Sequence, residues 1–127
     1  MEIMVVEDDE DTRTILCSIL RRKFPNVEIS SAANGREGVE LFSRRRPQIV
    51  VTDLNMPGMG GGGMVREIRQ LSPETMFIVV TADTGKGSLV EAFGEESQID
   101  HYVFKPVDYA TLFLAISRCI AKLQGAE

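Results

Sequence analysis

Polar side chains that could bind a cation and transfer a phosphoryl group follow four separate apolar runs of the sequence. If those runs are parallel strands of one sheet, their carboxyl ends meet at one edge and form the ligand site. Carboxylates gathered there repel one another unless a cation lies among them. In chain order, the residues are Glu7, Asp8 and Asp9 after the first run, Asp53 and Asn55 after the third, Thr81 after the fourth and Lys105 after the fifth.

The predicted cation is Mg²⁺. The candidate ligands are all oxygen atoms and few in number, which leaves room for several waters, and Mg²⁺ retains much of its hydration and often shares a site with phosphate. This donor set fits Mg²⁺ better than Zn²⁺ or a fully caged Ca²⁺.

Asp53 is the predicted nucleophile, because carboxylates of this kind form aspartyl-phosphates. Lys105, Thr81 and the metal would together stabilise the charge of a transferring phosphoryl group. Taken singly, an acidic residue after a strand is commonly only a helix N-cap, and Asp9 or Asp11 fits that description. The occurrence of such polar residues after four of the five apolar runs favours the chemical interpretation.

Five short apolar runs predict the strands that position these residues. Several are continuously apolar, as in parallel strands covered by helices on both faces. Helical spacing between and after them predicts a βα unit repeated five times, hence an α/β, doubly wound, five-stranded parallel sheet with five helices. The runs are Ile3 to Val6, Val27 to Ile29, Ile49 to Val51, Met76 to Val80 and Tyr102 to Phe104.

Prolines and glycines mark the limits of the predicted helices. Pro25, Pro47 and Pro73 follow the first three helical segments, where a residue without an N–H ends a helix at little cost. The run of residues 58–63 contains four successive glycines, which predict that the third helix begins late or that its leading loop is mobile. The fourth helix is also expected to be weak, because it contains glycines at positions 85, 87 and 94.

Size and composition predict a single cytoplasmic domain over residues 1–127. The chain is 43% hydrophobic, which suffices for a core without disulfides, and Cys17 and Cys119 lack the close spacing of a zinc site. The net charge of −5 argues against direct nucleic-acid binding. No apolar run approaches the roughly 18 residues that span a bilayer, so no membrane association is expected.

The sequence resembles the receiver domain of bacterial two-component response regulators over essentially its whole length. The resemblance implies a flavodoxin-like fold with strand order 2-1-3-4-5. It rests on Val5-Val6-Glu7-Asp8-Asp9, Asp53-Leu54-Asn55-Met56-Pro57-Gly58, Val80-Thr81-Ala82 and Tyr102-Val103-Phe104-Lys105-Pro106, supported by Ala33-Asn34-Gly35.

The resemblance also implies a role for each matching residue. These roles are Asp53 as phospho-acceptor and Mg²⁺ ligand, Asp8 as direct Mg²⁺ ligand, Glu7 as a partner through metal-bound water, Asn55 as ligand through its backbone carbonyl, Thr81 and Lys105 as partners of the phosphoryl oxygens, Tyr102 as the aromatic that turns inward when Thr81 moves, and Pro106 as the residue after a cis peptide bond.

The expected function is therefore a phospho-accepting signalling switch. A sensor histidine kinase or a phosphotransfer protein would donate the phosphoryl group, and a downstream protein or a fused output domain would read the result. The domain would catalyse only its own phosphorylation and dephosphorylation. One alternative is a phosphohydrolase of the haloacid dehalogenase type, but that class needs an acid two residues after the nucleophile, where this chain has Asn55. Another is a receiver-like scaffold that is never phosphorylated.

Overall fold

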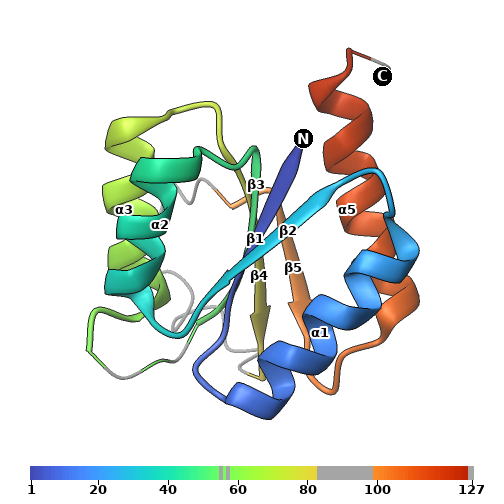
Figure 1. Ribbon diagram of the computed structural model, residues 1–127, viewed down its shortest axis with the longest axis horizontal. Coiled ribbons are helices and arrows are strands. Elements are labelled where there is room, and N and C mark those ends of the chain that lie inside the picture. The colour runs from blue at the N-terminus through green and yellow to red at the C-terminus, as the bar shows by residue number, and fades with distance from the viewer. Residues whose placement is uncertain (55, 57, 83–98, 126–127) are drawn as a thin grey trace.

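The computed structural model describes residues 1–54, 56, 58–82 and 99–125, and its centre is one parallel sheet. Its five strands lie in the order β2-β1-β3-β4-β5, so the predicted strand order is confirmed (Figure 1). All the pairings are parallel, so every strand ends at the same edge of the sheet. The strands are β1 (Glu2–Val6), β2 (Glu28–Ala32), β3 (Ile49–Asp53), β4 (Met76–Thr81) and β5 (His101–Phe104).

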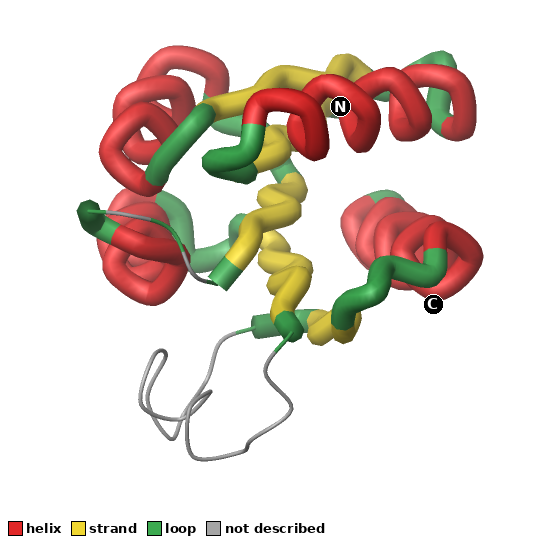
Figure 2. Tube along the Cα trace, turned by 90° about the horizontal axis from the view of Figure 1, so that it is seen from below, coloured by secondary structure: helices red, strands yellow, loops and turns green. Residues whose placement is uncertain are grey.

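The four described helices form two layers, one on each face of the sheet. Figure 2 shows both layers from the carboxyl edge of the strands. Helices α1 (Glu10–Lys23) and α5 (Tyr109–Leu123) cover one face, and α2 (Gly35–Arg45) and α3 (Gly60–Leu71) cover the other. The doubly wound α/β architecture is thereby confirmed. The predicted fourth helix, with its glycines at 85, 87 and 94, lies outside the described residues.

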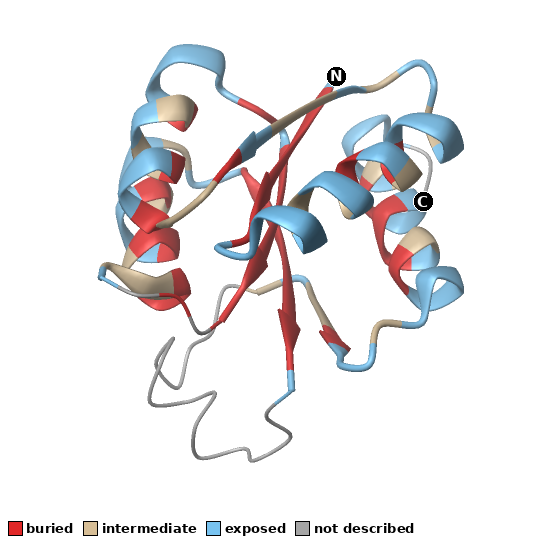
Figure 3. Cartoon of the chain, turned by 60° about the horizontal axis from the view of Figure 1, so that its bottom comes forward, coloured by how far each residue is buried: buried red, intermediate tan, exposed pale blue. Residues whose placement is uncertain are grey.

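The sheet separates two hydrophobic cores, and Figure 3 shows its central strands buried between helices whose outer faces are exposed. Alternate residues of β1 enter opposite cores: Ile3 and Val5 pack with residues of α1 and α5, whereas Met4 and Val6 pack with residues of α2 and α3. Each fully buried aliphatic side chain of this size contributes roughly 1.5–3 kcal/mol. Burial on both faces therefore fixes the central strands, and with them the positions of their carboxyl ends.

Short-range polar contacts set the ends of the helices. The Asp9 carboxylate accepts a hydrogen bond from the backbone N–H of Thr12 at 2.8 Å, so the N-cap alternative for Asp9 is confirmed. Helices α1, α2 and α3 end two residues before Pro25, Pro47 and Pro73, as predicted.

The predicted end of the second strand and the predicted late start of the third helix are wrong. Strand β2 extends to Ala32, three residues beyond the predicted end at Ile29, because a strand at the edge of a sheet tolerates polar residues such as Ser31. Helix α3 begins at Gly60, inside the glycine run, although glycine is a poor helix former. Close packing of its first turn against neighbouring backbone, which requires residues without side chains, outweighs the propensity.

Cys17 and Cys119 belong to the core between the sheet and helices α1 and α5. Both thiols are free and buried. Burial raises the pKa of Cys17 above its usual value and raises the pKa of Cys119 to about 12. These residues are therefore part of the hydrophobic packing.

Candidate functional site

Three carboxylates meet at the carboxyl edge of the sheet. Glu7 and Asp8 directly follow β1, and Asp53 is the last residue of β3, which pairs with β1. One carboxylate oxygen from each lies within 4.8 Å of the others. Glu7 and Asp53 are only 7% exposed, whereas Asp8 is exposed to solvent. The cluster therefore has a buried floor and one open side.

Three hydrogen bonds, one to its side chain and two to its backbone, hold Glu7 in place. Its Oε2 atom accepts a hydrogen bond from the Asp9 N–H at 3.0 Å, its own N–H donates to the Ala32 carbonyl at 3.1 Å, and its carbonyl accepts from the Arg13 guanidinium at 2.8 Å. Burial raises the pKa of the Glu7 carboxyl; the Asp9 N–H opposes this, and Asp8 and Asp53 raise the pKa further. Negative charge thus accumulates at a site that is partly shielded from water.

Lys105 supplies the cation of the cluster. Its Nζ atom lies 2.7 Å from Oδ2 of Asp53, and its backbone N–H donates to the Thr81 carbonyl at 2.8 Å. Burial alone would lower the pKa of Lys105, but the hydrogen bond and charge of Asp53, with the charges of Glu7 and Asp8, raise it above its usual value. Lys105 therefore remains protonated at neutral pH.

The predicted residues around Lys105 are placed by β4 and β5. Thr81 is the last residue of β4, is fully buried and pairs in register with Phe104. The Lys105–Pro106 peptide bond is cis, as the family resemblance implies. Tyr102 is half-buried and pairs in register with Val79. It therefore lies two positions before the Thr81–Phe104 pair, farther from the carboxyl ends of the strands.

The donor set fits a hard divalent cation. Glu7, Asp8 and Asp53 can offer three carboxylate oxygens, and the Lys105 ammonium pairs with one of these residues, Asp53. A small oxygen-preferring cation such as Mg²⁺ would offset the remaining repulsion. Asn55, whose backbone carbonyl is the fourth predicted ligand, lies outside the described residues.

Sequence reasoning missed two residues that shape this site. Arg13, in the first turn of α1, donates to the Glu7 carbonyl and fixes the segment that leaves β1. Gly61, in the first turn of α3, lies against the backbone of Asp53 and Leu54. For Gly61 a signal was present, because a run of four glycines at a helix start is poor for helix formation and points to close backbone approach. Arg13 had no comparable signal.

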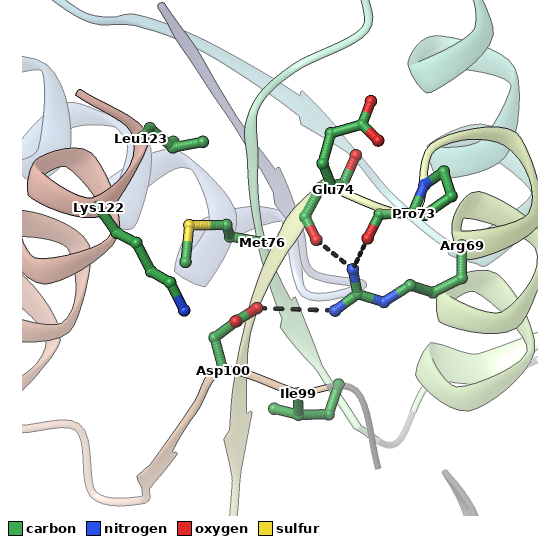
Figure 4. A pocket seen from close by; sticks show the side chains of 9 residues that line it. Arg69, Pro73, Glu74, Met76, Ile99, Asp100, Lys122 and Leu123 are labelled. Carbon is green, nitrogen blue, oxygen red and sulfur yellow. Dashed lines mark hydrogen bonds and ion pairs between the residues drawn. The ribbon is translucent and has the colours of Figure 1, made fainter. Parts of the chain in front are cut away.

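A second polar cluster lies at the opposite edge of the sheet, beside an open cavity of about 520 Å³. Figure 4 shows the Arg69 guanidinium between the turn that follows α3 and Asp100 (Figure 4). It donates to the carbonyls of Pro73, at 2.7 Å, and Thr75, and lies 3.7 Å from Oδ2 of Asp100. Asp100 also accepts from the N–H of Phe77 at 2.8 Å. In this cluster Arg69 pairs with Asp100, and both side chains also bind backbone groups.

The order of strands, the acidic cluster and the Asp53–Lys105 pair agree with a match to a known family. Residues 3–117 match the response regulator receiver domain. The chain belongs to this family. The predicted family is thereby confirmed, and the receiver domain can be compared with individual relatives.

Curated relatives extend beyond this receiver domain. The transcriptional regulatory protein AfsQ1 of Streptomyces coelicolor is 34% identical over 105 residues, which are 83% of this chain and 44% of that protein. The probable transcriptional regulator ycf27 of Porphyridium aerugineum is 33% identical over 126 residues, which are 99% of this chain and 50% of that protein. The chain thus spans about half or less of the length of these relatives.

Solved structures support the same fold. A two-component response regulator of the LuxR family from Aurantimonas sp. SI85-9A1 superposes with a TM-score of 0.84 at 32% identity, covering 95% of this chain and 85% of that one. A response regulator receiver domain protein from Clostridium thermocellum superposes with a TM-score of 0.85 at 24% identity, covering 99% and 98%. The second likeness bears on the fold alone. None of the described helices has the length and apolar character needed to cross a bilayer.

Proposed function

We propose that this receiver domain is a phospho-accepting switch in which Asp53 takes up a phosphoryl group. The observation that carries the proposal is the Asp53–Lys105 pair at 2.7 Å beside two further carboxylates. A structural ion pair would have no need for the additional negative charge. An acceptor carboxylate that must first bind a metal and then a phosphoryl group would need both the acids and the lysine.

In the proposed reaction, a carboxylate oxygen of Asp53 attacks the phosphorus atom of the donor. A new P–O bond forms while the P–N bond of a phosphohistidine, or the acyl P–O bond of a small donor such as acetyl phosphate, breaks, and the leaving group keeps the bonding electrons. The Lys105 ammonium pairs with the transferred oxygens, and the Thr81 hydroxyl donates a hydrogen bond to one of them.

Asp8 and Asp53 would hold Mg²⁺ directly, Glu7 would act through a metal-bound water, and Asn55 would contribute its backbone carbonyl. When bound, the ion supplies positive charge that offsets the carboxylates and the phosphoryl oxygens. Burial raises the pKa of Glu7, and Asp8 and Asp53 raise it further; this supports the assignment, because a bound cation would stabilise the charged carboxylates. Tyr102 would turn inward when Thr81 moves toward the phosphoryl group.

The proposed setting is a cytoplasmic two-component system. A sensor histidine kinase or a phosphotransfer protein would donate the phosphoryl group, and a protein partner or a fused output domain would respond. Residues 1–127 would act as one domain that turns over no metabolite and touches neither nucleic acid nor membrane. Two relatives are named as transcriptional regulators, and the part of each that aligns with this chain is half of its length or less. The remaining length could hold an output domain, which supports an output step.

The proposal is tested by intact-mass spectrometry after incubation with acetyl phosphate and Mg²⁺. The wild-type protein is expected to gain one phosphoryl mass, and Asp53→Asn is expected to gain none. Asp100→Asn is the matched control, because it removes a carboxylate of the same kind at the opposite edge of the sheet and should leave uptake intact. A phosphoryl group found on another residue, or uptake by Asp53→Asn, would contradict the proposal.

A further inference from the structure

The first turn of α3 lies directly against the end of β3. Gly61 is buried there, and its N–H donates to the Leu54 carbonyl at 3.2 Å. A Cβ atom built on Gly61 would lie 2.6 Å from the carbonyl oxygen of Asp53, 3.2 Å from that of Leu54 and 3.3 Å from the Leu54 Cα atom. The space that a side chain would need is therefore occupied by the backbone of the acceptor residue and its neighbour.

Contacts of this length leave no room for a methyl group. Real Cβ atoms essentially never approach another heavy atom within 3.0 Å, and here the obstructing atom belongs to the backbone, which cannot rotate aside as a side chain can. A larger residue would force either the start of α3 or the peptide after Asp53 to move. Because Asp53 projects its carboxylate from that backbone, a shift of the peptide would displace the carboxylate from Lys105 and from Glu7.

We propose that Gly61 is a positioning residue for phosphoryl acceptance: its missing side chain allows α3 to approach the Asp53 and Leu54 carbonyls and so sets where the Asp53 carboxylate points. The inference rests on the proposed function of Asp53. Small displacements matter in such a reaction, since a shift of about 1 Å can slow a reaction by about a hundredfold.

Other glycines of the same packing contact provide matched controls. A Cβ on Gly35, at the start of α2, would lie 2.9 Å from the Gly60 carbonyl oxygen and 3.0 Å from Cβ of Met59. It would disturb the same turn of α3 without touching Asp53. A Cβ on Gly63 would meet only the Cγ atom of Met59, at 3.1 Å, which belongs to a flexible side chain. Substitutions at these two positions therefore distinguish a general loosening of α3 from a displacement of Asp53.

The experiment compares Gly61→Ala, Gly35→Ala and Gly63→Ala with the wild type. For each folded protein, the rate of phosphorylation by acetyl phosphate and the Mg²⁺ concentration that gives half the maximal rate are measured well below the thermal midpoint. We expect Gly61→Ala to slow phosphorylation by tenfold or more and to require more Mg²⁺. Gly35→Ala and Gly63→Ala are expected to remain within about twofold of the wild type.

A measurement on the wild type keeps the inference testable if Gly61→Ala does not fold. The amide signal of Gly61 in NMR spectra should shift on addition of Mg²⁺ and beryllium fluoride, because its acceptor carbonyl adjoins Asp53, whereas the amide of Gly63 should move little. The inference is overturned if the Gly61 amide does not respond, if Gly61→Ala matches the wild type, or if Gly35→Ala is equally slow. A wild type that takes up no phosphoryl group would instead overturn the proposed function itself.

Discussion

The two edges of the sheet each carry an ion pair between elements distant in sequence, but the pairs are built differently. At the carboxyl edge, Asp53 and Lys105 lie 2.7 Å apart beside two more carboxylates. At the amino edge, Arg69 and Asp100 lie 3.7 Å apart; Arg69 also donates to two backbone carbonyls and stacks on Phe77, and Asp100 accepts from a backbone N–H. We propose that the surplus negative charge at the carboxyl edge serves to bind a ligand, whereas the pair at the amino edge serves the fold.

The comparison predicts that Mg²⁺ binds only at the carboxyl edge. Asp8→Asn is expected to weaken Mg²⁺ binding by about a hundredfold, roughly 2.7 kcal/mol, because it removes a charged oxygen ligand. Asp100→Asn at the amino edge is expected to change the affinity by less than about twofold. Isothermal titration calorimetry on the three proteins measures both effects, and equal affinities for wild type and Asp8→Asn would refute the assignment.

The amino edge should matter for stability instead. Arg69→Met is expected to lower the free energy of unfolding by about 2 kcal/mol, since two backbone carbonyls and Asp100 lose a donor and the stacking of the guanidinium on Phe77, at 4.8 Å, is lost. Arg22→Met, at an exposed position on α1, is the like-for-like control and should cost less than about 0.5 kcal/mol. Urea unfolding gives both values; similar losses would remove the distinction between the edges.

The carboxyl edge should become more stable when a charge is removed. Glu7→Gln is expected to raise the free energy of unfolding at pH 7 without metal by about 1 kcal/mol, because the fold raises the pKa of Glu7 and so disfavours its charged form. The gain should vanish below about pH 4.5, where Glu7 is protonated in both states. Glu10→Gln at an exposed position serves as the control. If Glu7→Gln instead lowered the free energy of unfolding in the absence of metal, the negative charge of Glu7 would not destabilise the fold and the prediction would be wrong.

The smallest predicted effect is the pH dependence of Mg²⁺ binding. Because the pKa of Glu7 is raised above 4.5, protons should compete with the cation at a pH above the usual range of a glutamate. We expect a few-fold loss of affinity as the pH is lowered from neutral toward 4.5, a change of about 1 kcal/mol or less. Titrations at constant ionic strength measure it. Glu7→Gln should flatten the profile, and an unchanged slope in that variant would assign the effect to another group.

The central strands and the position of the acidic cluster could be predicted because their signals are local in the sequence, whereas the strand order was implied by the family resemblance. Continuous apolar runs mark β1, β3 and β4, and polar residues follow each run directly. The end of β2 could not be predicted, because an edge strand carries serines that are also typical of loops. Local pattern thus predicts the buried centre better than the edge.

Contacts between distant residues were invisible to the same reasoning. The start of α3 within the glycine run depends on the approach of Gly61 to Asp53, which helix propensity does not contain. The Arg69–Asp100 pair likewise joins the end of α3 to the residue before β5, and no motif marks either residue. For the proposed site, the residue types and the predicted strand ends were enough to predict that Glu7, Asp8 and Asp53 lie together. The backbone contacts that orient these side chains could be seen only in the folded structure.

The two buried cysteines give this domain a built-in reporter of its own opening. With pKa values raised above the usual range and almost no exposure, Cys17 and Cys119 should react extremely slowly with alkylating reagents while the chain is folded. Labelling then requires α1 or α5 to leave the sheet, so its rate follows the population of opened molecules. Because the two thiols lie on different helices, mass spectrometry of the labelled peptides would tell whether these helices detach together or one at a time.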